Sequence, residues 1–112
     1  MAQITCKELA LWQSAGFAFT LLDVRRAAAR GSDGADIAGA SWHDPARWLD
    51  WKDGVVADRP VVLYCAHGHE ISQGLTATLR AMQVDARHLA GGIAAWRQAG
   101  LAVVPHATEE SG

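Results

Sequence analysis

The chain has 112 residues, of which 50% are apolar and 20% are charged, enough for one compact domain and too few for two. Its formal net charge is −2, without a block of like charges, so neither nucleic acid nor an anionic membrane is expected as a partner. The N-terminus lacks the pattern of a signal peptide, and polar residues interrupt the apolar stretch 9–24, which excludes it as a membrane span. We therefore expect a cytoplasmic protein with Cys6 and Cys65 as free thiols.

Helix-like and strand-like segments alternate from the N-terminus onward. A cap at Thr5, followed by Leu9, Trp12 and Ala15 at helical spacing, predicts a helix that Gly16 ends. The next segments are predicted as a buried strand, a short helix, a loop, a short strand and one or two helical turns, over residues 19–24, 25–30, 31–36, 40–43 and 47–51.

The second half contains the best strand, Val61–Tyr64, whose continuous apolar run suits a central parallel strand. The helix after it is predicted to turn Ile71, Leu75, Leu79 and Met82 to one face. The remaining segments are a short strand, a helix that begins at a glycine pair and an edge segment, over residues 85–89, 91–98 and 102–105. We expect one domain over residues 1–105 and a polar, disordered tail over residues 106–112.

This alternation predicts an α/β three-layer domain with a mainly parallel sheet. Ligands of such sheets bind beyond the carboxyl ends of the strands. The predicted strand ends bring Asp23, His43, Cys65 and Gly91 toward that edge, so the site is expected there.

Cys65 lies directly after the best strand and before an amphipathic helix. Loop amides and the positive end of a helix favour thiolate over thiol, and Gly68 allows the loop to curl into an anion-binding nest. The same amides suit a persulfide or a bound oxyanion. The alternative is that Cys65 is a small buried apolar residue, as free cysteines often are.

Four motifs occur in order and at compatible spacing: Leu22–Arg25, Ile37–Ala40, Val61–Gly68 and Gly91–Trp96. Together they resemble the rhodanese family over roughly residues 3–105. The resemblance implies a parallel five-stranded sheet flanked by helices, and a Cys65 that accepts sulfane sulfur as a persulfide and passes it to a thiophilic acceptor. It also implies that Asp23 and Arg25 support the fold and the rim of the site. The predicted substrate-binding residues are those of the loop, namely Ala66, His67, Gly68, His69, Glu70 and Ile71.

The end of the loop departs from the family pattern, in which arginine or another polar residue is followed by serine or threonine. Here Glu70 and Ile71 take those places and Ser72 comes one position later. An acidic Glu70 repels anionic donors, so thiosulfate is expected to be a poor donor. The loop is also similar to that of rhodanese-like domains associated with chromate-resistance proteins. Phosphatases of this fold need an arginine where Ile71 stands, which excludes that activity.

Cys65, His67 and His69 also form a Cys-x-His-x-His run, which is a possible set of soft metal ligands. A fourth ligand is not evident, although His43 or Glu70 would serve. The favoured interpretation is that both loop histidines point outward and tune the charge of the loop. We therefore predict no metal and no cofactor.

Other residues have a structural and a functional interpretation. His43 either reaches the site in a supporting role or lies on its rim, whereas His88 is expected to be structural. Trp96 is predicted to lie in the core, and Cys6 to be passive packing. The tryptophans at positions 42, 48 and 51 either close the core or form an apolar docking wall beside the site.

Two classes of function remain open at this point. The first is a sulfurtransferase that exchanges sulfur with a small-molecule or protein donor and acceptor. The second is a non-catalytic domain whose altered loop binds an oxyanion, a metal or a protein. A pure binding module has no need of a thiol at position 65, which favours the enzyme. The donor, the acceptor and the oligomeric state do not follow from the sequence.

Overall fold

The computed structural model describes residues 2–105, so the predicted tail lies outside the described residues. In chain order the elements are β1 (Gln3–Ile4), α1 (Cys6–Ala15), β2 (Thr20–Asp23), α2 (Ala27–Asp33), β3 (Ala35–Ile37), β4 (Ser41–Trp42), the 3-10 helix η1 (Pro45–Arg47), α3 (Trp48–Trp51), the 3-10 helix η2 (Lys52–Gly54), β5 (Val61–Tyr64), α4 (Glu70–Ala81), β6 (Ala86–Leu89), α5 (Gly92–Gln98) and β7 (Val103–Pro105). Within this range, no helix is long and apolar enough to span a membrane.

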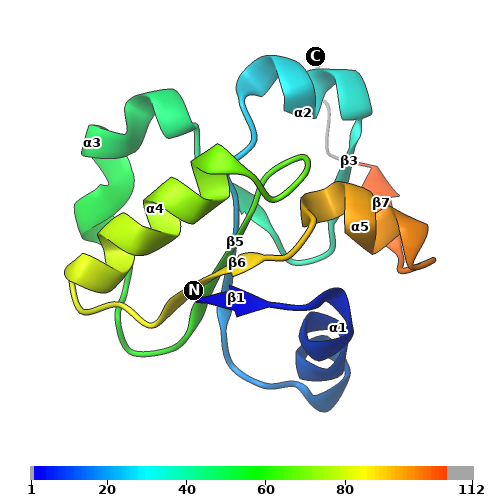
Figure 1. Ribbon diagram of the computed structural model, residues 1–112, viewed down its shortest axis with the longest axis horizontal. Helices are drawn as coiled ribbons and strands as arrows, with labels where there is room; N and C mark the ends of the chain where they lie inside the picture. Colours follow the sequence, from blue (N-terminus) through cyan, green and yellow to red (C-terminus); the bar gives the residue numbers. More distant parts are fainter. Residues whose placement is uncertain (1, 106–112) are drawn as a thin grey trace.

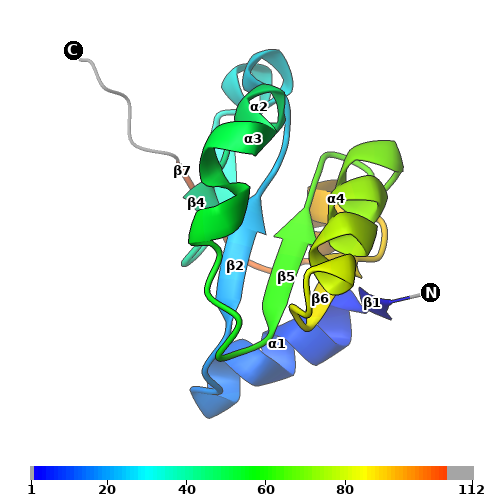
Figure 2. The same ribbon diagram turned by 90° about the vertical axis from the view of Figure 1, so that its left-hand side faces the viewer.

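Five strands form one parallel sheet in the order β1-β6-β5-β2-β4. The central strand is β5, and all four of its residues are buried, as the continuous apolar run predicted. Helices α3 and α4 lie on one side of the sheet and α1 and α5 on the other (Figures 1 and 2). The predicted mainly parallel, five-stranded α/β architecture is confirmed. A separate antiparallel pair joins β3 to β7.

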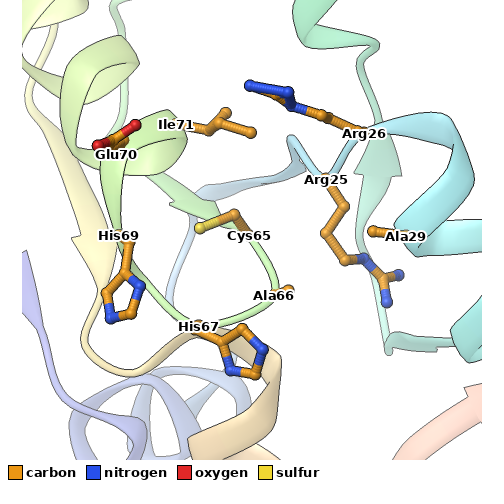
Figure 3. A pocket seen from close by; sticks show the side chains of 9 residues that line it. All are labelled: Arg25, Arg26, Ala29, Cys65, Ala66, His67, His69, Glu70 and Ile71. Atoms are coloured by element: carbon orange, nitrogen blue, oxygen red, sulfur yellow. The ribbon is translucent and has the colours of Figure 1, made fainter.

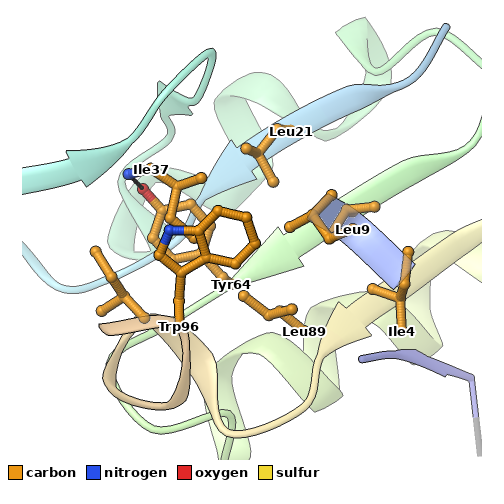
Figure 4. Packing of buried hydrophobic residues seen from close by; sticks show 9 residues of the cluster. Ile4, Leu9, Leu21, Ile37, Tyr64, Leu89 and Trp96 are labelled. Carbon is orange, nitrogen blue, oxygen red and sulfur yellow. Dashed lines mark hydrogen bonds between the residues drawn. The ribbon is translucent and has the colours of Figure 1, made fainter. Parts of the chain in front are cut away.

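Each face of the sheet has its own apolar core. The core under α1 and α5 contains Trp96, which is 2% exposed (Figure 4), and the indole Nε1 of Trp96 donates to the Ala102 carbonyl at 2.8 Å. On the opposite face, Trp48 and Trp51 pack edge to face, with ring centroids 4.8 Å apart, against the second core. These two tryptophans therefore close the core, as the structural interpretation predicted. That interpretation is wrong for Trp42, which is 37% exposed and whose indole N–H donates to the Arg25 carbonyl at 2.9 Å.

The first helix follows its predicted signals. The Thr5 side chain accepts from the Glu8 backbone N–H at 3.1 Å, and the Glu8 carboxylate accepts from the Thr5 backbone N–H at 2.9 Å. This reciprocal capping box satisfies two N–H groups that a helix start leaves without partners. Gly16 ends the helix in the left-handed conformation, with φ of 67°.

The segment around α2 differs from the prediction, which placed a helix at residues 25–30 and a loop at 31–36. Arg25 lies outside the helix, and its backbone N–H and its side chain both donate to the Asp23 carboxylate. The helix instead runs from Ala27 to Asp33 and is followed by β3. Asp33 pairs with Arg25 and with Arg97 of α5, and these long-range contacts override the loop-like local composition.

Helix α4 forms as predicted but presents a different face to the sheet. Its buried residues are Ser72, Thr76 and Leu79. Ile71 and Leu75 are only half-buried against the second core, and Met82 is 37% exposed. The helix is therefore rotated relative to its apolar periodicity, which brings Ser72 inward and leaves Ile71 at the edge of the helix.

Candidate functional site

Cys65 is the first residue after β5 and lies at the carboxyl edge of the sheet, where the site was expected. It borders a cavity of about 490 Å³ between α2, the loop at residues 65–69 and the start of α4 (Figure 3). The lining residues are Arg25, Arg26 and Ala29 on the α2 side, Cys65, Ala66, His67 and His69 in the loop, and Glu70 and Ile71 on α4. Cys65 is only 6% exposed, so its sulfur is recessed in this cavity.

The loop is anchored to the first turn of α5 by its own carbonyl groups. The carbonyls of Cys65 and Ala66 accept from the backbone N–H groups of Ile93 and Ala94, each at 3.0 Å. In a trans peptide the N–H points away from the carbonyl of the same unit, and no described peptide bond is cis. The N–H groups of Ala66 and His67 are thus turned away from α5. An anion-binding nest needs N–H groups that are free of such bonds, and the nest in this loop stays a prediction.

Two glycines permit the close approach of the loop to α5. A Cβ atom on Gly68 would lie 2.7 Å from the Gly91 nitrogen, and one on Gly92 would lie 2.7 Å from the Gly68 nitrogen. Gly68 and Gly92 also have positive φ angles of 73° and 63°, which glycine adopts without strain. The Gln73 side chain adds a hydrogen bond of 2.8 Å from its Nε2 to the Gly68 carbonyl. The loop is thereby tied to both neighbouring helices.

Ser72 is a site residue that the sequence analysis did not find. Its Oγ lies 3.2 Å from the Cys65 Sγ, and the residue is fully buried. The sequence comparison with the family treated Ser72 as displaced by one position, yet the rotation of α4 brings this hydroxyl to the sulfur. The sequence did contain one signal for this contact. Ser72 comes two positions after the start of a helix that begins close to Cys65 in the chain.

Arg25 is held in a buried ionic cluster beside the cavity. Its guanidinium lies 2.7 Å from Asp23, 2.7 Å from Asp33 and 2.9 Å from Asp36. Burial lowers the pKa of Arg25, but the hydrogen bond and the charge of Asp23 more than offset that effect, and the pKa is raised. Asp23 itself is 1% exposed and does not line the cavity. Arg25 therefore lines the cavity with its positive charge matched by carboxylates, and a supporting role of the pair at the rim stays a prediction.

The loop histidines do not converge on Cys65. The rings of His67 and His69 have centroids 6.1 Å apart, and in Figure 3 both lie on the far side of the loop from Ile71 and Arg26. Across residues 2–105, no three His, Cys, Asp or Glu side chains gather into a group able to hold a metal ion. The Cys-x-His-x-His run therefore gains no structural support as a metal centre.

His43, His88 and Cys6 lie outside the cavity lining. The His43 ring packs edge-on against Trp51, with centroids 4.9 Å apart, so it contacts α3 instead of the loop. His88 is buried in β6 at 2% exposure. Cys6 packs against the first core, where burial raises the pKa of its thiol. Cys6 and Cys65 are both free thiols, as predicted.

The mouth of the cavity carries charges of opposite sign on opposite walls. Arg26 stands at the start of α2 and Glu70 is the first residue of α4, and both are exposed. In Figure 3 the Arg26 side chain extends from the α2 side toward Ile71. Ile71 lines the cavity at the position where a phosphatase needs an arginine. The α4 side of the cavity therefore has no guanidinium group at this position that could bind phosphate.

A five-stranded parallel sheet whose central strand ends at a recessed cysteine, followed by a short loop and a helix, fits the rhodanese-like class. The chain belongs to the family of the rhodanese-like domain, whose model matches residues 5–99. A comparison with curated protein sequences gave no match.

Solved structures with the same fold agree with this assignment. A rhodanese-related protein from Thermoplasma volcanium has 23% identity and a TM-score of 0.82, over 95% of this chain and 100% of that one. A rhodanese-like domain protein from Staphylococcus aureus has 24% identity and a TM-score of 0.75, over 86% of this chain and 91% of that one. A thiosulfate sulfurtransferase from Pseudomonas aeruginosa has 25% identity and a TM-score of 0.73, over 92% of this chain and 19% of that one.

Proposed function

We propose that this protein is a sulfurtransferase that carries a sulfane sulfur on Cys65 as a persulfide. The observation that carries the proposal is the position of Cys65, recessed in a cavity of about 490 Å³ on a loop whose carbonyls bond to α5. Backbone N–H groups on the concave side stabilise negative charge on sulfur without a metal or a cofactor.

The reaction has two displacement steps on sulfur. The Cys65 thiolate attacks the sulfane sulfur of the donor, and the bond from that sulfur to the rest of the donor breaks with the electron pair leaving on the donor. The product is the Cys65 persulfide. A thiophilic acceptor then attacks the outer sulfur of the persulfide, and Cys65 leaves as the thiolate. The loop amides and the Ser72 hydroxyl, 3.2 Å from the Cys65 sulfur, face the charge that returns to sulfur.

Glu70 affects which sulfur donors are expected to bind. It lines the cavity and its negative charge repels a dianion, so thiosulfate is proposed to be a poor donor. Two free thiols fit a reducing compartment, for which we propose the cytoplasm. Donor and acceptor are small molecules or proteins that present sulfur, and neither nucleic acid nor a membrane is a proposed partner.

The test is intact mass spectrometry after incubation with a panel of sulfane donors, followed by removal of excess donor. The wild type is expected to gain the mass of one sulfur atom. Cys65→Ser should abolish the gain, whereas Cys6→Ser, which changes the other free thiol, should retain it. A persulfide mapped to Cys6, or the absence of any gain with every donor, would refute the proposal and leave a non-catalytic binding domain as the function.

A further inference from the structure

The two charged residues at the mouth of the cavity have no ionic partner within the described residues. Arg26 and Glu70 both line the cavity, and neither forms an ion pair with the other or with another of residues 2–105. They come from different walls, since Arg26 precedes α2 and Glu70 begins α4. A cation and an anion therefore face the same cavity without neutralising each other.

The third charged residue of the lining behaves differently. Arg25 contacts three carboxylates within 2.9 Å and is 1% exposed, so it offers no free charge to a ligand. In Figure 3 its guanidinium points down and away from the Cys65 sulfur, whereas Arg26 extends across the top of the view. Arg26 and Glu70 thus provide the formal charges that a substrate meets at the mouth.

Two apolar side chains share the cavity lining with these charges. Ala29 of α2 and Ile71 of α4 line the cavity together with Arg26 and Glu70. Cavities of about this volume take small molecules, and Cys65 at 6% exposure is reached more readily by a small thiol than by a folded partner. The apolar walls suit a short hydrocarbon segment between a reacting sulfur and charged groups.

Resting on the proposed function, we propose that the sulfur acceptor is a small amino-acid thiol that carries both a carboxylate and an ammonium group. The carboxylate faces Arg26 and the ammonium group faces Glu70, while the methylene beside the sulfur contacts Ile71. The acceptor thiolate attacks the outer sulfur of the Cys65 persulfide, the sulfur–sulfur bond to Cys65 breaks, and Cys65 regains the electron pair. The products are the Cys65 thiolate and the amino-acid persulfide, with no net oxidation. A dianion such as thiosulfate, by contrast, is attracted by the positive charge of Arg26 but repelled by the negative charge of Glu70.

The experiment measures persulfide removal by four thiols that differ in charge. Protein is loaded with excess inorganic polysulfide and desalted, and the loss of the Cys65 persulfide is followed by intact mass. The thiols are cysteine with both charges, N-acetylcysteine with the carboxylate, cysteamine with the ammonium group, and 2-mercaptoethanol with neither. Each rate is expressed as a selectivity over 2-mercaptoethanol. The ratio of wild-type to variant selectivity then cancels the intrinsic reactivity of each thiol.

Exposed charge pairs set the expected size of the effect at about two- to fivefold per charge. Arg26→Gln should lower the selectivity for cysteine and N-acetylcysteine by that factor. Glu70→Gln should lower it for cysteine and cysteamine and raise it for N-acetylcysteine. Arg26 makes no side-chain capping bond to α2, so its substitution does not remove a cap. Arg47→Gln, at an exposed arginine of η1, controls for net charge and should leave all selectivities as in the wild type.

The outcomes separate this inference from the proposed function. If wild-type Cys65 loads and unloads but both variants keep the wild-type selectivities, the amino-acid thiol is wrong and sulfur transfer stands. If Arg47→Gln shifts the selectivities as much as Arg26→Gln, the effect belongs to net charge and the inference is again wrong. If no protein acquires a persulfide, the proposed function is refuted, and the inference with it.

Discussion

The sulfur of Cys65 lies 3.2 Å from the hydroxyl oxygen of Ser72, in a buried contact between the end of β5 and the first turn of α4. Either atom can donate while the thiol is protonated, but a thiolate accepts only, so the serine must donate once Cys65 ionises. A hydrogen bond to a charged group is stronger than a neutral one. Ser72 is therefore placed to donate to the Cys65 thiolate that the proposed function requires.

Ser72→Ala should slow both iodoacetamide alkylation of Cys65 and its loading with sulfur. Loss of a hydrogen bond to a charged group costs about 1.5–3 kcal/mol, or roughly 10- to 100-fold in rate if all of it is expressed there. Thr76→Ala is the matched control, because Thr76 lies one turn further along the same buried face and its hydroxyl has no partner within the described residues. Equal slowing in both variants would mean that α4 packing, and not the hydroxyl, controls the sulfur.

Glu70→Arg should lower the apparent KM for thiosulfate by about two- to tenfold, since the change replaces repulsion of a dianion by attraction. The effect should be larger at low salt, where screening is weak. Asp58→Arg makes the same charge change at an exposed residue before β5, at the opposite edge of the sheet, and should leave KM near the wild-type value.

Steady-state thiosulfate:cyanide kinetics at two ionic strengths provide the measurement. The electrostatic argument would be wrong if the wild type already used thiosulfate efficiently and Glu70→Arg left KM unchanged.

The sheet and the position of Cys65 directly after its central strand followed from local sequence signals, whereas the face that α4 buries did not. Val61–Tyr64 is a buried strand on composition alone, and Cys65 follows it directly. The apolar pattern of α4 placed Ile71 toward the sheet, but the structure buries Ser72 and leaves Ile71 half-buried in the cavity wall. Helical periodicity considers only apolar residues. It therefore cannot predict that Ser72 is buried, because the partner of Ser72 is the sulfur atom of Cys65.

Long-range ion pairs explain why α2 extends into residues that were predicted as a loop. Residues 31–36 have the composition of a loop, yet Asp33 pairs with Arg25 and with Arg97 from a distant helix. A single sequence contains no local sign of such pairing. The opposed charges of Arg26 and Glu70 likewise became visible only when α2 and α4 were placed on two sides of one cavity.

Gly92→Ala should destabilise the fold and abolish sulfur loading together. The new Cβ would collide with the Cys65 carbonyl oxygen, and φ is +63°, where non-glycine residues cost about 1–2 kcal/mol. Gly74→Ala in α4 is the matched control, since nothing lies within 4 Å of its Cβ position. Removing a helical glycine there should stabilise by about 0.5–1 kcal/mol. Urea unfolding and persulfide loading measure the two effects, and a Gly92→Ala protein with normal stability and loading would contradict the packing argument.

His88 should lower the free energy of unfolding as the pH falls below about 6.5, the ordinary pKa of histidine. Its side chain is 2% exposed in β6, and its Nδ1 has no hydrogen-bond partner within residues 2–105. Burial lowers the pKa of His88 below its ordinary value of 6.5. Between the lowered pKa and the ordinary one, the unfolded chain binds a proton that the folded chain does not, so the free energy of unfolding decreases as pH falls through that range.

For one proton the slope contributed by His88 reaches at most about 1.4 kcal/mol per pH unit. The contribution is fully present above pH 6.5, the ordinary value, and is lost progressively below it. His88→Leu removes the titrating ring and its unpartnered nitrogen from an apolar face shared with Ala86 of the second core. Urea unfolding from pH 7.5 downward should therefore give a flatter profile for His88→Leu than for the wild type. Parallel profiles would show that His88 is protonated equally in the folded and unfolded states, and that another group controls the acid sensitivity of the fold.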